Sequence, residues 1–191
     1  WGMVLWFTAY SVTAAGLVFQ LVPSQKALGV PSATLLTAVA LIGPSQVAGR
    51  LAMMWLGERA HLSVLGAFTT TLIPISLLIL ILAPAKLVAL CLFAVSFGMA
   101  NGITTILRGV APGAWLGHQH LGRTMGLIGT PMLVMTALAP LVTAAVWSAT
   151  GSVHAMQWSV FAMALCGAGG FWFAVFARRR ARHLNASAWR D

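Results

Sequence analysis

The chain has 191 residues, of which 60% are hydrophobic and only 7% are charged. A soluble domain carries about 25% charged residues, so this composition excludes an ordinary water-soluble fold. The formal net charge of +9 does not indicate a nucleic-acid partner, because the basic residues stand at the ends of long apolar runs. The lipid bilayer is therefore the expected solvent and partner of the chain.

Uncharged runs divide the sequence into stretches of membrane-spanning length. They cover residues 1–25, 27–49, 60–85, 87–107 and 124–177. A helix needs about 20 apolar residues to span a bilayer, so the first four runs can supply one helix each and the last run two. Open sheets leave backbone groups unpaired in hydrocarbon, and these runs lack the alternation of a β-barrel. We therefore predict an all-α integral membrane protein with six transmembrane helices.

Turn-forming residues set the limits of the predicted helices. In chain order the helices cover residues of about 2–23, 33–56, 63–83, 86–108, 121–147 and 155–177. Pro23 opens the first connection, Gly57 ends the second helix, and Pro112 lies in the connection after the fourth. Together they make one transmembrane bundle within residues 1–183, followed by a cytoplasmic tail at 184–191.

The connections alternate in charge along the chain. One set holds Arg59, Arg108, Arg123 and the arginine cluster at 178–182, whereas the other set holds only two lysines. The positive-inside rule places the arginine-rich set in the cytoplasm. We therefore expect a multi-pass protein of the cell membrane with both chain ends cytoplasmic. Topology then accounts for Arg108, at the expected end of the fourth helix.

Arg50 is the one charge that topology does not readily explain, because it lies about two turns inside the second predicted helix. An arginine at such depth costs at least about 2.5 kcal/mol on insertion scales and usually faces protein or a water-filled cavity. Gln46 lies four residues earlier, on the same helix face. Two explanations stay open. Arg50 and Gln46 meet an anionic solute or a carboxylate of another helix, or Arg50 extends to the cytoplasmic headgroups.

Other polar side chains lie inside the predicted helices, chiefly Tyr10, Gln20 and Asn101. Each could form an interhelical hydrogen bond worth about 0.6–2 kcal/mol, or together they could line one polar cavity. The span interiors contain no Asp, Glu, His or Lys. Because neither a paired acid nor a Ser–His arrangement is visible, we expect no enzyme activity.

Histidine and cysteine give little sign of a metal site. His118 and His120 stand in the fourth connection, but zinc sites usually need three or four protein ligands. Cys91 and Cys166 lie inside apolar runs, as small buried hydrophobic residues do. The sequence therefore predicts no bound metal and no cofactor.

Glycines at four-residue spacing predict close helix contacts. Two such pairs are Gly98 with Gly102, and Gly122 with Gly126. Such a pair predicts packing but does not identify the partner helix. Prolines such as Pro44 lie in mid-helix and tend to kink a helix, either as a fixed bend or as a bending point during gating.

Residues 43–61 read Gly-Pro-Ser-Gln-Val-Ala-Gly-Arg-Leu-Ala-Met-Met-Trp-Leu-Gly-Glu-Arg-Ala-His. This segment resembles the link between the second and third helices in the C-terminal half of major facilitator superfamily transporters. The family signature there is Gly-x-Leu-Ala-Asp-Arg-x-Gly-Arg-Arg, and Met53 and Met54 stand where it has Asp and Arg. The six-helix pattern with a basic tail is also similar to that half. The resemblance implies a gating loop formed by Gly49, Gly57, Glu58 and Arg59.

By this resemblance the chain is half of a 6+6 bundle that moves a small solute by alternating access, around a site between the two halves. Because the chain begins at Trp1 within an apolar run, we expect an N-terminal six-helix half upstream of it. The alternative is a non-transporting membrane subunit or assembly factor, which needs no water-filled cavity.

Overall fold

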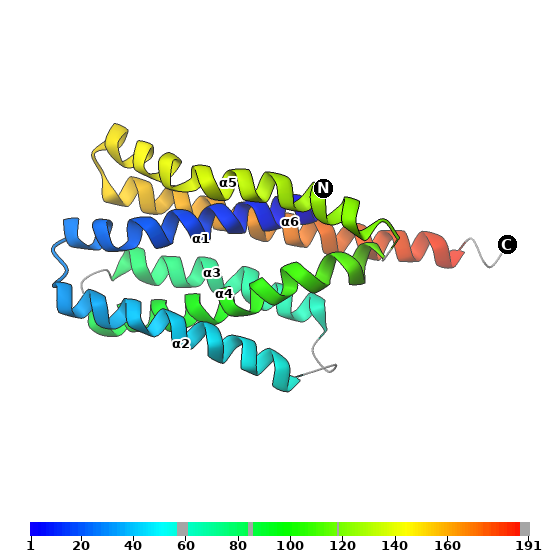
Figure 1. Cartoon of the computed structure of the whole chain (residues 1–191), viewed down its shortest axis with the longest axis horizontal. Helices are drawn as coiled ribbons and strands as arrows, with labels where there is room; N and C mark the ends of the chain where they lie inside the picture. The colour runs from blue at the N-terminus through cyan, green and yellow to red at the C-terminus, as the bar shows by residue number, and fades with distance from the viewer. Residues whose placement is uncertain (57–60, 84–85, 118, 188–191) are drawn as a thin grey trace.

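The computed structural model describes residues 1–56, 61–83, 86–117 and 119–187, with side chains as far as Arg180. The described chain forms six helices and no strand: α1 (Gly2–Ala27), α2 (Ser32–Leu56), α3 (Leu62–Leu82), α4 (Leu87–Leu116), α5 (Leu121–Thr150) and α6 (Val153–Ser187) (Figure 1). All six are long and apolar enough to cross a membrane. The predicted all-α architecture with six membrane-spanning helices is confirmed at this level.

Two prolines that were expected in connections lie inside helices. α1 continues through Pro23 to Ala27, and α4 continues through Pro112 to Leu116. A proline removes one backbone hydrogen bond, but neighbouring helices in a membrane bundle can hold such a turn in place. The predicted helix ends at 23 and 108 were therefore wrong. In consequence Arg108 lies well inside α4 and not at its end.

The last two helices also extend beyond their predicted ends. α5 continues to Thr150, and Gly151 ends it in the left-handed conformation, at φ of 62°. Glycine adopts this conformation without strain, so a helix commonly ends there. α6 runs to Ser187 and takes in part of the segment that was expected to be a tail.

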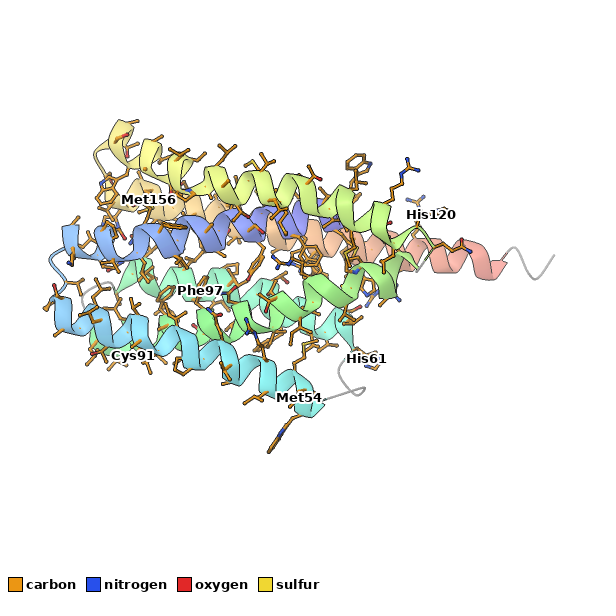
Figure 2. All side chains as sticks on the ribbon, in the orientation of Figure 1. Met54, His61, Cys91, Phe97, His120 and Met156 are labelled. Atoms are coloured by element: carbon orange, nitrogen blue, oxygen red, sulfur yellow. The ribbon has the colours of Figure 1, made fainter. Side chains whose placement is uncertain are left out.

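Both chain termini lie at the same end of the bundle, here called the terminal end (Figure 1). Figure 2 places Met54, His61 and His120 toward this end and Met156 at the opposite end. An even number of antiparallel helices produces this arrangement. That the terminal end faces the cytoplasm stays a prediction from the arginine distribution.

The first three helices and the last three pack in the same pattern. α2 packs mainly on α4 and α5 mainly on α1, α3 packs on α4 and α6 on α1, and α3 and α6 pack on each other. We call α1–α3 and α4–α6 the two three-helix units. If each helix of the first unit is exchanged with its counterpart in the second, the same pairings result. Because each unit has an odd number of helices, the second unit runs in the opposite direction, so that α1 begins at the terminal end and α4 ends there (Figure 1).

The apolar core lies among α1, α3, α4 and α6. Near the terminal end the rings of Trp6 and Phe171 meet edge to face, with centroids 4.8 Å apart. Farther along, Phe93 and Phe97 stack at 5.5 Å, and Figure 2 shows Phe97 between the helices. α2 and α5 bury few of their residues, so they form the edges of the bundle.

Glycines bring α2 and α4 into backbone contact. A Cβ atom on Gly102 would lie 2.2 Å from the Gln46 carbonyl oxygen, and one on Gly49 would lie 2.5 Å from the Met99 carbonyl oxygen. The close contact predicted for Gly98 and Gly102 is therefore confirmed, with α2 as the partner. Gly122 and Gly126 have no such neighbour within 4 Å in the described chain.

Candidate functional site

Polar residues of α1 and α4 meet inside the bundle. Asn101 lies at the middle of α4, and the Tyr10 hydroxyl donates a hydrogen bond to its side-chain oxygen Oδ1. Tyr10 is only 6% exposed, so the pair is shielded from the surroundings. The bond joins α1 to α4, two helices that otherwise contact each other little.

Two arginines lie near this pair, Arg108 on α4 itself and Arg50 on α2, which packs on α4. Both charges are close enough to act on the Tyr10 side chain. Arg108 follows Asn101 by seven residues, so both lie on one face of α4. The glycine contact between α2 and α4 holds Arg50 close to the same region. The structure therefore brings together Tyr10, Arg50 and Asn101, and it adds Arg108.

Arg108 is the residue that reasoning from the sequence missed. It was assigned to topology because the fourth helix was expected to end there. The signal that could have found it is the apolar sequence that follows, which includes Val110, Ala111, Trp115 and Leu116. This stretch extends the hydrophobic helix past the arginine and places the charge inside the span.

Neither arginine has an acidic partner in the described chain. The whole sequence holds only two acidic residues, Glu58 and Asp191, and both lie outside the described residues. Arg108 Nη1 has the Met132 sulfur at 3.7 Å, a weak acceptor. The side chains of Arg50 and Arg108 are both exposed at the surface of the six-helix bundle. The cluster is thus a concentration of positive charge without an internal counter-charge in the part of the chain that is described.

A cavity of about 310 Å³ adjoins Arg108, between α4 and α5. The α4 wall consists of Thr105, Arg108 and Gly109, and the α5 wall of Met125, Ile128, Gly129 and Met132. The Thr105 hydroxyl donates to the Gly102 carbonyl oxygen at 2.7 Å. The volume of the cavity is at the lower end of the range for small-molecule sites. The cavity therefore combines a cationic wall with an apolar one.

The two predicted glutamines lie in different places. Gln46 is half-buried one turn before Arg50, and its backbone carbonyl meets Gly102. Gln20 lies about 15 Å along α1 from Tyr10, at the helical rise per residue, and lines a small cavity with Ser24 and Gln157. Gln20 therefore does not join the arginine cluster, because the predicted common face of α1 extends over too great a length.

The gating-loop residues implied by the family resemblance are only partly described. Gly49 lies inside α2, as the predicted helix 33–56 requires, and is buried against the Met99 backbone. A small residue there lets α4 approach α2 closely. Gly57, Glu58 and Arg59 lie outside the described residues. Within the described ranges no group of three or more His, Cys, Asp or Glu could hold a metal ion.

No protein-family model, curated protein or solved structure matches this chain. The geometry of the cluster is therefore the main guide to function. Guanidinium groups are permanent hydrogen-bond donors and never lose their charge in proteins. The guanidinium groups of Arg50 and Arg108 can therefore bind a negatively charged or strongly polar group.

Proposed function

We propose that this chain is one half of a facilitator-type secondary transporter that moves a small solute by alternating access. The observation that carries the proposal is the Tyr10–Asn101 pair between α1 and α4, with the exposed side chains of Arg50 and Arg108 on α2 and α4 close to it. Transporters built from inverted repeats bind their solutes near the bilayer midplane, at the interface between repeats.

The energetic cost of the cluster supports a functional role. Each arginine at depth costs at least about 2.5 kcal/mol on insertion scales. A helix bundle that served only as a scaffold would gain nothing by keeping Arg50 and Arg108 at this depth. A water-filled cavity that opens to either side of the membrane would solvate both charges and offset that cost.

The uncovered sides of α2 and α5 support the second part of the proposal, a missing half. Both edge helices bury few residues within the bundle. In the proposed transporter an N-terminal six-helix half faces these helices and closes the other side of the cavity. The terminal end then lies in the cytoplasm, as the arginine distribution predicts.

Cysteine accessibility in the complete gene product tests the proposal. Cys91 and Cys166 are first replaced by alanine, and Gln46→Cys is then exposed to a membrane-impermeant polar thiol reagent in oriented vesicles. We expect reaction from either side, because alternating access opens the site to each side in turn. The matched control is Ala48→Cys, at nearly the same depth but about 200° around the helix from Gln46, which we expect to stay protected by lipid.

The competing function, a non-transporting membrane subunit or assembly factor, predicts a different result. Without a water-filled cavity, Gln46→Cys would stay unreacted from both sides, like Ala48→Cys. That outcome would overturn the proposal. Reaction from one side only would indicate a fixed binding pocket and would also exclude alternating access.

A further inference from the structure

We infer that the solute is a small organic anion held by Arg108 in the cavity between α4 and α5, an inference that rests on the proposed transport function. Arg50 lies on α2, which packs on α4, and supplies a second positive charge to this region. Residues of like charge that converge inside a membrane need a counter-charge close by. The question is which group supplies it.

The described residues offer these arginines no counter-charge, and the two acidic residues of the sequence, Glu58 and Asp191, lie outside the described ranges. An arginine does not become neutral by losing its proton. Two like charges on neighbouring helices repel each other, and an anion bound beside Arg108 offsets that repulsion. An anionic solute is therefore the partner that completes the cluster.

The walls of the adjoining cavity narrow the class of anion. The planar guanidinium fork matches a carboxylate through two parallel hydrogen bonds. The opposite wall is apolar, with Met125, Ile128 and Met132 on α5. Methionine side chains adapt to irregular apolar shapes. A carboxylate with a short apolar body fits this pairing of walls better than an inorganic anion, which would leave the α5 wall without a suitable contact.

The sign of the local potential can be measured without knowing the natural solute. In the Cys91→Ala, Cys166→Ala background, Thr105→Cys places a thiol in the cavity beside Arg108. Its reaction rates are measured in the complete gene product with two methanethiosulfonates, the anionic sulfonatoethyl and the cationic trimethylammonioethyl reagents. Each rate is divided by that of the same reagent with free cysteine. We expect the anionic reagent to be favoured by about tenfold or more, as charged clefts concentrate opposite ions.

Variants then assign this preference to the two arginines. Arg50→Gln and Arg108→Gln should each lower the preference several-fold, whereas Arg50→Lys and Arg108→Lys should retain it because the charge remains. Arg179→Gln is the matched control. It removes the same charge from an exposed position at the terminal end and should leave the ratio unchanged.

A normalised ratio of one or less in the parent Thr105→Cys protein would overturn the inference, whether or not the glutamine variants fold. An anionic preference that survives both glutamine substitutions would overturn it as well. The two proposals fail separately. Access from both sides without anionic preference would leave transport standing and remove the anion. Anionic preference without alternating access would leave an anion site on a protein that does not transport.

Discussion

Two glycine pairs of the same four-residue spacing, one on α4 and one on α5, have different surroundings. On α4, Gly102 lies against the backbone of α2, so that a Cβ atom there would be 2.2 Å from the Gln46 carbonyl oxygen. On α5, Gly122 and Gly126 have no such neighbour within 4 Å in the described chain. The motif thus permits close approach without dictating it. What distinguishes the two copies is whether this bundle supplies the approaching helix.

The largest expected effect lies at the filled pair. Gly102→Ala should destabilise the bundle by about 1–3 kcal/mol, because the atoms in the way belong to the α2 backbone and cannot rotate aside. Unfolding of the purified protein in detergent measures the change. Gly109→Ala, on the same helix but with no neighbour within 4 Å, is the control. Equal stability of the two variants would contradict the close contact of α2 and α4.

An intermediate effect is expected where the two three-helix units meet through polar groups instead of glycine. Tyr10→Phe removes the hydroxyl that donates to Asn101. A double-mutant cycle with Asn101→Ala should give a coupling of about 0.6–2 kcal/mol, the usual range for such bonds between membrane helices. A coupling near zero would mean that α1 and α4 are held only by their neighbours.

The smallest effect, and one of opposite sign, is expected at the unfilled pair. Gly126→Ala should raise the stability of this chain by up to about 1 kcal/mol, because alanine is the better helix former and no atom opposes its Cβ. The same unfolding measurement applies. A loss of stability in this chain would show that α5 has a neighbour that the described structure lacks. A loss seen only in the complete gene product would place a partner helix there.

The number and order of the helices could be predicted from the sequence because both depend on the length of each apolar run. Continuous apolar runs give the number and order of the helices without reference to their partners. The helix ends were less accurate because Pro23 and Pro112 were taken as breaks, whereas both lie within helices. The misplaced end of α4 in turn hid the role of Arg108.

The candidate site could be predicted only in part. Arg50 and Asn101 were found because a polar residue inside an apolar run is costly at any orientation. The bond between Tyr10 and Asn101 depends on how α1 and α4 face each other. Hydrophobic periodicity carries no such information, because lipid and a neighbouring helix are equally apolar.

The pairing of α2 with α4 has a consequence for how the protein is made. α2 has the lowest mean hydropathy of the six spans, at 1.3, and it carries Arg50. Its packing partner leaves the ribosome only after the whole of α3 has been synthesised. During that interval Arg50 lacks α4 beside it. We therefore expect α2 to depend on the insertion machinery for shelter until α4 emerges.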